Sequence, residues 1–238
     1  MTAKSLFLAG GTGAVGRRLL PLLVADGWRV TASTRSPDKA ELLRRLGAKP
    51  VVVDVFDAAA LRSAMMDVRP EVVVHQLTDL PPGLDPEKMA DALPRNTRIR
   101  EEGTRNLVAA ALACGARRLV AQSIAFAYAE GRLPHREEDA LNPNAIGVIS
   151  LEGQVMDAAI EGIVVRYGRF YGPGTGFDAP HGAPALHVDA AARACELACL
   201  GGERGIYNIA EDDGAVSSEK AKRAFPGWSA DWRIGASG

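Results

Sequence analysis

Cysteine is scarce in this sequence, and the few cysteines form no recognisable framework. Cys114, Cys195 and Cys199 are an odd number without the spacing of a small disulfide-bonded domain. Cys195 and Cys199 are four residues apart in an apolar, helix-like run, which predicts buried thiols rather than a metal or redox pair. The cysteines therefore argue against a disulfide scaffold and indicate no metal site.

Long apolar runs and a strong net charge are missing as well. No run approaches the roughly 18 apolar residues that a membrane-spanning helix needs, and the segment after Lys4 lacks the pattern of a signal peptide. The formal net charge of −1 gives no indication of nucleic-acid binding. We therefore expect a cytoplasmic protein that acts on a small molecule and binds neither nucleic acid nor membrane.

What the sequence does contain is an alternation of short apolar runs and longer amphipathic segments. Strands are expected at 4–9, 29–34, 51–53, 71–75, 117–122, 162–167 and 205–210. Helices are expected at 14–26, 37–46, 58–66, 96–114, 150–161 and 190–200. Uniformly apolar strands separated by helices predict an α/β fold with a doubly wound parallel sheet, the Rossmann type. We expect one domain over 1–238, with a dinucleotide-binding core at 1–165 and a small substrate lobe over most of 166–238.

A glycine-rich turn lies between the first expected strand and the first expected helix. The stretch GGTGAVG at 10–16 fits both G-x-G-x-x-G and G-x-x-G-x-x-G. Glycines in this position allow a sharp turn, a close approach to a pyrophosphate and tight packing of helix on strand. No Lys-Ser or Lys-Thr follows, which excludes a Walker-type loop. The predicted pyrophosphate-binding residues are Gly10, Thr12, Gly13, Ala14, Val15 and Gly16.

An acidic residue is missing where the second expected strand ends. A ribose 2′-hydroxyl usually has a carboxylate partner there, whereas a 2′-phosphate has an arginine. The segment after this strand offers Thr34, a guanidinium at Arg35, a hydroxyl at Ser36 and a cation at Lys39. These residues favour NADP, with NAD as the alternative, and the missing acid argues against an S-adenosylmethionine-dependent methyltransferase.

Two later strand ends complete the predicted cofactor site. Asp54, followed by Val55, is placed to accept a hydrogen bond from an adenine amino group. Gln76, Leu77 and Thr78 would pass beside a cofactor ribose. His75, just before them, is expected to pack or cap rather than to catalyse.

With these residues in place, the chain resembles the extended short-chain dehydrogenase/reductases, in their NAD-dependent epimerase/dehydratase branch. The segments that carry the resemblance are GGTGAVG, DVFD, GTRNLVAAALACGARRLV, RYGRFYGPGTG and ALHVDAAARA, in that order over nearly the whole chain. The resemblance implies that Asn106 fixes the long helix beside the site. It also implies that Arg35 meets the 2′-phosphate, that Asp54 meets the adenine, and that a homodimer is possible.

The catalytic residues of that family are largely absent. The family expects a Ser or Thr after the fifth strand, which Ser123 matches, and then a Tyr-x-x-x-Lys pair on the next long helix. That tyrosine acts as acid and base, and the lysine lowers its pKa. Here the corresponding segment, NAIGVISLEGQVMDA, has neither residue, and no lysine occurs between Lys88 and Lys220.

Three interpretations follow from this absence. Tyr128, or else Tyr167 or Tyr171, could replace the missing proton donor. Alternatively, the substrate could be activated, so that hydride transfer needs little help from a proton. In the third interpretation the protein is a non-catalytic NADP(H)-binding regulator. The leading prediction is an NADP-dependent oxidoreductase or epimerase-like enzyme that uses Ser123, with Tyr128 as the candidate donor.

Overall fold

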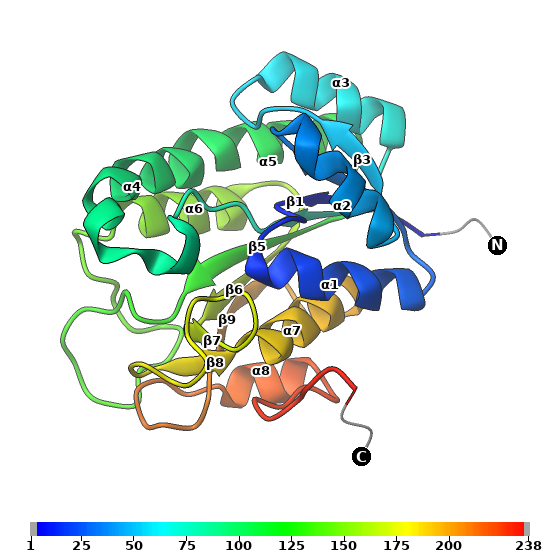
Figure 1. Ribbon diagram of the computed structural model, residues 1–238. Coiled ribbons are helices and arrows are strands. Elements are labelled where there is room, and N and C mark those ends of the chain that lie inside the picture. The colour runs from blue at the N-terminus through cyan, green and yellow to red at the C-terminus, as the bar shows by residue number, and fades with distance from the viewer. Residues whose placement is uncertain (1–3, 236–238) are drawn as a thin grey trace.

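Seven parallel strands form the centre of the molecule (Figure 1). The computed structural model describes residues 4–235. The strands lie in the order β3-β2-β1-β4-β5-β6-β9, and every neighbouring pair is parallel. Their bounds are β1 Ser5–Ala9, β2 Arg29–Thr34, β3 Lys49–Val52, β4 Val72–His75, β5 Arg118–Ile124, β6 Glu161–Tyr167 and β9 Gly205–Ile209. The chain reverses its direction of winding between β1 and β4, which is where doubly wound sheets bind their ligands.

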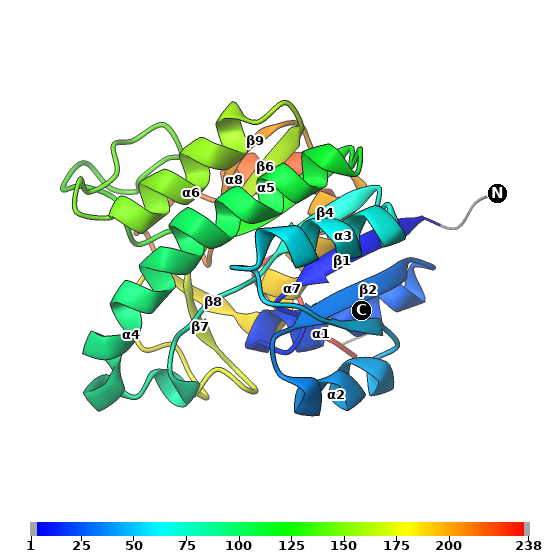
Figure 2. The same ribbon diagram turned by 90° about the horizontal axis from the view of Figure 1, so that it is seen from above.

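Helices cover both faces of the sheet (Figures 1 and 2). One face packs against α1 Ala14–Ala25, α2 Ala40–Arg45, α7 Val188–Leu200 and α8 Glu219–Ala224. The other packs against α3 Ala58–Val68, α5 Thr104–Ala113 and α6 Ile146–Asp157. Alternate residues of β1 divide between the two cores, with Leu6 and Leu8 in the first and Phe7 and Ala9 in the second. The predicted Rossmann sheet is confirmed.

The long helix before β5 differs from its prediction. It begins at Pro86 rather than near residue 96, as α4 Pro86–Arg98, and continues through the π-helical turn η3 Ile99–Gly103 into α5. The side chain of Asp85 caps it by accepting a hydrogen bond from the amide of Glu87. The extra turns were missed because α4 reaches beyond the sheet (Figure 2), buries only Ala92 and Asn96, has few apolar residues and contains Pro94, which normally argues against a helix.

The C-terminal part of the chain is shared between the central sheet and smaller elements. It supplies β9 and α7 to the sheet and its cover, together with α8 and a separate two-stranded sheet of β7 Arg169–Tyr171 and β8 Ala185–His187. Two short 3-10 turns, η1 Pro37–Lys39 and η2 Pro82–Leu84, complete the described elements. The division of the domain at residue 165 stays a prediction.

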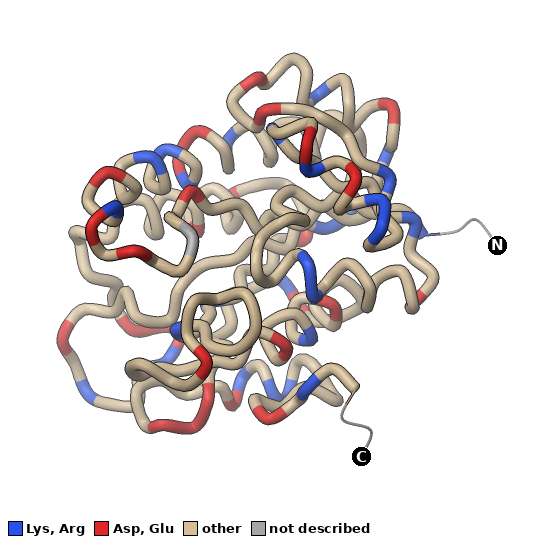
Figure 3. The backbone as a smooth tube through the Cα atoms, viewed as in Figure 1, with Lys and Arg blue, Asp and Glu red and all other residues tan. Residues whose placement is uncertain are grey.

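The helices, the surface charges and the cysteines can each be compared with what the sequence predicted. No helix in the described residues is long and apolar enough to cross a bilayer. Basic and acidic residues alternate along the chain (Figure 3), and no face of a single sign appears in that view. Cys195 and Cys199 are both buried and unpaired, as predicted. The cellular location stays a prediction.

Candidate functional site

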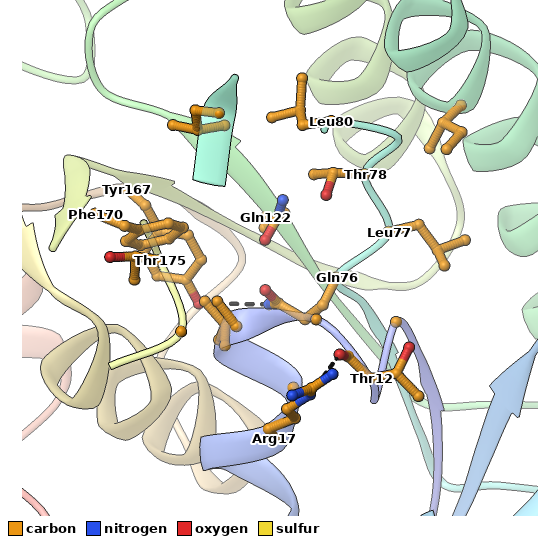
Figure 4. A pocket seen from close by; sticks show the side chains of 18 of the residues that line it. Thr12, Arg17, Gln76, Leu77, Thr78, Leu80, Gln122, Tyr167, Phe170 and Thr175 are labelled. Atoms are coloured by element: carbon orange, nitrogen blue, oxygen red, sulfur yellow. Dashed lines mark hydrogen bonds between the residues drawn. The ribbon is translucent and has the colours of Figure 1, made fainter. Parts of the chain in front are cut away.

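A cleft of about 910 Å³ opens along the carboxyl ends of the strands. Its walls come from the segments that follow β1 to β6, so residues far apart in the sequence meet there. This is a large volume for a small-ligand site, which is typically about 300–1,000 Å³. Figure 4 shows side chains of this wall, among them Thr12, Gln76, Gln122 and Phe170.

The glycine turn forms one side of the cleft, and close backbone contacts require glycine at two of its positions. Gly10 has φ +98°, and a Cβ there would lie 2.4 Å from the carbonyl oxygen of Gln76. A Cβ on Gly16 would lie 2.3 Å from the carbonyl oxygen of Gly10. Gly13 is the N-cap of α1 and supplies no capping side chain. The first-turn N–H groups of α1 therefore have no intrahelical partner and suit an anion in the cleft.

The segment after β2 brings the predicted 2′-phosphate residues to the same cleft. Arg35, Ser36 and Lys39 all line it. Arg35 donates two hydrogen bonds, of 3.2 and 3.4 Å, to the carboxylate of Asp79 in the segment after β4. The side chain of Arg35 is 58% exposed, so this pair is weak and an anion that enters the cleft can replace it.

The remaining predicted cofactor residues also line the cleft. Asp54 lies at its edge and accepts a hydrogen bond from the amide of Phe56. Asn106 of α5 donates to the carbonyl oxygen of Val55 at 2.9 Å and so ties the long helix to this edge, as expected from the resemblance. The structure brings together the whole predicted set, and its binding of a cofactor stays a prediction: Gly10, Thr12, Gly13, Ala14, Val15, Gly16, Thr34, Arg35, Ser36, Lys39, Asp54, Val55, Gln76, Leu77 and Thr78.

Ser123 lies at the opposite wall, above a buried ion pair that the sequence did not predict. Ser123 and Arg166 are paired in register on β5 and β6, so their side chains point to the same face of the sheet, under α6. Glu152 of α6 accepts a 2.7 Å hydrogen bond from the Ser123 hydroxyl. It also accepts two bonds from Arg166, at 2.9 and 2.6 Å. Glu152 is 4% exposed and Arg166 3%.

This ion pair fixes the direction of the hydrogen bond that Ser123 makes. Burial lowers the pKa of Arg166, but its hydrogen bonds and ion pair with Glu152 outweigh that effect and raise the pKa above the usual arginine value. A paired carboxylate only accepts hydrogen bonds. The hydroxyl hydrogen of Ser123 therefore points to Glu152, and Ser123 itself is among the residues that line the cleft.

The family's Tyr-x-x-x-Lys pair would have to occupy this face of α6. Glu152 is the α6 residue that reaches Ser123, and the residue four positions before it is the buried Val148. Neither a tyrosine nor a lysine occurs on α6, whose sequence is IGVISLEGQVMD.

Tyr128, the candidate donor, is placed away from the cleft. Its hydroxyl donates to Asn208 Oδ1 at 2.7 Å and accepts from Arg166 at 2.7 Å, and its ring stacks on His135. Burial raises its pKa, and it is not among the cleft residues. Tyr171 is likewise outside the cleft, with its hydroxyl on Glu211. A chemical role for Tyr128 stays a prediction that this geometry does not support.

Tyr167 does line the cleft, but its hydroxyl is committed inside the protein. Gln76 donates to that hydroxyl at 3.4 Å (Figure 4), and burial raises the pKa of the phenol well above its usual value. His75 is fully buried and shares a 3.0 Å hydrogen bond with Thr104. It packs and does not reach the cleft, as predicted.

Two loops meet across the cleft. A Cβ on Gly176, in the loop after β7, would lie 2.5 Å from the Cα of Gly83 in the loop after β4. Both glycines have positive φ, and the two loops lie side by side in Figures 1 and 2. A side chain at Gly176 would push the loops apart, so glycine is required at this contact.

The comparisons with known proteins agree with this geometry. A family model described as NAD(P)H-binding matches residues 10–176. The chain belongs to this NAD(P)H-binding family. Its fold and its reductase relatives make it an extended short-chain dehydrogenase/reductase of the oxidoreductase and epimerase type.

Among curated proteins, the NAD(P)H-binding chain is similar to two reductases. It is 40% identical over 226 residues to the 3-diazoavenalumate denitrifying reductase of a Streptomyces species. This alignment covers 91% of this chain and 71% of the reductase. It is 28% identical over 244 residues to the dTDP-4-dehydrorhamnose reductase of Streptomyces griseus, covering 92% and 74%. These relatives do not favour a non-catalytic regulator.

Among solved structures, the fold is similar to two epimerases. The UDP-glucose 4-epimerase of Thermotoga maritima with UDP-glucose superposes with a TM-score of 0.79 at 18% identity, covering 97% of this chain and 94% of that one. The UDP-glucose 4-epimerase of Thermus thermophilus with NAD gives 0.72 at 20% identity, covering 92% and 82%.

Proposed function

We propose that this protein is an NADPH-dependent reductase whose substrate accepts hydride without a proton from the enzyme. The observation that carries the proposal is the hydrogen bond from Ser123 to the Glu152 carboxylate, 2.7 Å long and backed by Arg166. Because its hydrogen is used on Glu152, Ser123 would meet a ligand in the cleft only as a hydrogen-bond acceptor.

Reduction of an ordinary ketone is poorly served by this arrangement. Hydride addition turns the carbonyl oxygen into an alkoxide, which needs hydrogen-bond donors and then a proton. The lone pairs of Ser123 would repel that oxygen. Helix α6 has no tyrosine or lysine to supply the donor pair, and Tyr128 does not line the cleft. Epimerisation through a keto intermediate meets the same difficulty.

A diazonium or comparable cationic electrophile suits the site better. Hydride from NADPH adds to the terminal nitrogen of an arenediazonium ion and gives a neutral diazene. The diazene loses N2 as its C–N bond breaks and its N–H hydrogen moves to the ring carbon. NADPH is oxidised, the arene is reduced, and no external proton is consumed. The relative named as a denitrifying reductase of a diazo compound supports this class of substrate.

The preference for NADPH is supported by the segment after β2. Arg35, Ser36 and Lys39 line that end of the cleft, and the strand ends without an acid. The glycine turn would hold the pyrophosphate through backbone N–H groups. The bound dinucleotide would supply the hydride, and the lone pairs of Ser123 would face the positive charge of the electrophile.

The test is to mix the protein with NADPH carrying deuterium at C4 and with an arenediazonium salt. A ketone, a quinone and an enone serve as comparison substrates. We expect faster NADPH oxidation with the diazonium salt than with the ketone, release of N2, and deuterium on the ring carbon of the arene. Gly16→Val, which cannot form the glycine turn, corrects for the reaction without enzyme. Turnover of the ketone with no turnover of the diazonium salt would refute the proposal.

A further inference from the structure

The cleft carries more positive charge than a dinucleotide would use. Asp54 is the one carboxylate among the described residues that line it. The basic residues that line it are Arg17, Arg18, Lys39, Arg35, Arg100 and Arg169. Arg17 and Arg18 follow β1, and Arg35 and Lys39 follow β2, so these four lie beside the predicted phosphate sites. Arg100 and Arg169 come from η3 and β7, so they remain for another ligand.

Arg100 is held in the cleft by the π-helical turn. The extra residue of a π turn shifts the helix face, and such turns are frequent at functional sites. Its stem packs on α6, where a Cβ on Gly147 would lie 3.3 Å from Arg100 Cδ. The charge of Arg100 lies close enough to His75 to lower the pKa of that imidazole, and the charge of Glu152 acts to raise the pKa of Arg100. The guanidinium is therefore near the wall that carries Ser123.

No carboxylate in the described part of the chain lies within ion-pair distance of Arg100. Burial lowers its pKa, although the charge of Glu152 opposes this. Arg98, two residues earlier, is by contrast exposed and bonded to Glu102 at 2.7 Å. A partly buried guanidinium without a partner is costly unless a ligand supplies the anion.

Arg169 adds a second cation to the cleft lining. It donates to the carbonyl oxygen of Ala183 at 3.4 Å, and its guanidinium lies 4.2 Å over the ring of Phe126. Within the described residues no carboxylate forms an ion pair with it either. The cleft lining that comes from the same segments includes the apolar residues Leu80, Leu84, Ile99, Phe126 and Phe170, together with polar ones such as Gln122 and Thr175.

From this arrangement we infer that the substrate is a planar aromatic carboxylate, with its carboxylate bound by Arg100 and its ring between the apolar walls. The inference rests on the proposed function and names its substrate class. An Arg fork matches a carboxylate in two hydrogen bonds, and apolar walls suit an aromatic ring. A nucleotide diphosphate carries more negative charge than one carboxylate, and Arg100 and Arg169 are the two cations left for it in this lining.

The first test measures binding without turnover. Protein saturated with NADP+ is titrated with trans-cinnamate, cinnamamide and UDP by calorimetry. We expect wild type to bind cinnamate about ten- to hundredfold more tightly than the amide, since one charged hydrogen-bonding partner is lost. Arg100→Gln should remove that difference and Arg100→Lys should restore part of it, whereas Arg98→Gln should leave it intact. Equal affinity for the acid and the amide in wild type, or tighter binding of UDP, would overturn the inference.

The second test separates this inference from the proposed function. A diazonium salt with a ring carboxylate is compared with its methyl ester. We expect Arg100→Gln to raise the KM of the acid about tenfold or more with little effect on the ester. Equal KM values for acid and ester in wild type would refute the carboxylate site and leave the reductase standing. No turnover of either salt, with cinnamate binding still lost in Arg100→Gln, would refute the reaction and leave the site standing.

Discussion

At the scale of single residues, Arg35 has one anionic partner in the structure, the carboxylate of Asp79, and one predicted partner, a 2′-phosphate. In the structure its guanidinium donates to Asp79, which Arg95 also approaches at 3.5 Å. An exposed pair of this kind contributes at most about 1 kcal/mol. A 2′-phosphate carries more charge than one carboxylate and can accept the same fork of N–H groups. We therefore expect the pair with Asp79 to leave Arg35 able to bind a 2′-phosphate.

Arg35→Ala is accordingly expected to weaken NADP+ binding about ten- to hundredfold, through the loss of charged hydrogen bonds. NAD+ has no 2′-phosphate and should lose less than about threefold. Fluorescence or calorimetric titration with both dinucleotides measures the difference. Arg45→Ala, an exposed arginine on α2 outside the cleft, is the control. Equal losses for both dinucleotides, or none, would remove Arg35 from the 2′-phosphate site.

At the scale of elements, β5, α6 and β6 form the unit that sets the chemistry. The register of β5 with β6 places Ser123 beside Arg166, and α6 brings Glu152 over both. Burying two charges is expensive, and removing one partner leaves the other unpaired at a cost of about 3–5 kcal/mol. The pair therefore depends on these three elements being assembled together.

Glu152→Gln should lower the free energy of unfolding by about 3–5 kcal/mol, because Arg166 would stay buried without its counter-charge. Urea denaturation measures the change. Glu41→Gln, which removes one partner of an exposed pair with Arg44, should cost at most about 1 kcal/mol. If the two substitutions cost the same, the Glu152–Arg166 pair does not stabilise the fold as described.

Elements are also where prediction from the sequence succeeded and failed. The glycine turn and the strand ends could be predicted from the chain, because each depends on its neighbours in sequence or on a strand pattern, and Asn106 was predicted from the family resemblance. Glu152 was not predicted as a site residue, because its role exists only once β5, α6 and β6 meet. Arg100 was missed for a related reason. Its exposure to the cleft depends on the π turn and on Gly147, which is distant in sequence.

At the scale of the whole molecule, stability should depend on pH through His75. Burial, aided by the charge of Arg100, lowers its pKa from 6.5 to about 4. Between these values the unfolded chain binds a proton at His75 that the folded chain does not. The free energy of unfolding therefore falls as the pH drops from 6.5 to about 4, by up to about 1.4 kcal/mol per pH unit from this group.

His75→Gln should flatten that part of the pH profile, since glutamine does not titrate. The measurement is a set of urea unfolding curves for wild type and variant between pH 4 and 7. The difference between their slopes isolates His75 from carboxylates that titrate in both proteins. Parallel profiles would show that the pKa of His75 is the same in the folded and unfolded states.

The contact between Gly83 and Gly176 has a consequence for the timing of the reaction. Gly83 and, beside Gly176, Gly174 and Thr175 line the cleft, so the contact lies at the cleft wall. A bound dinucleotide is longer than the proposed aromatic acid, so its exchange would more often require the two loops to part. We therefore expect release of the oxidised dinucleotide, once in each turnover, to be slower than exchange of the small substrate.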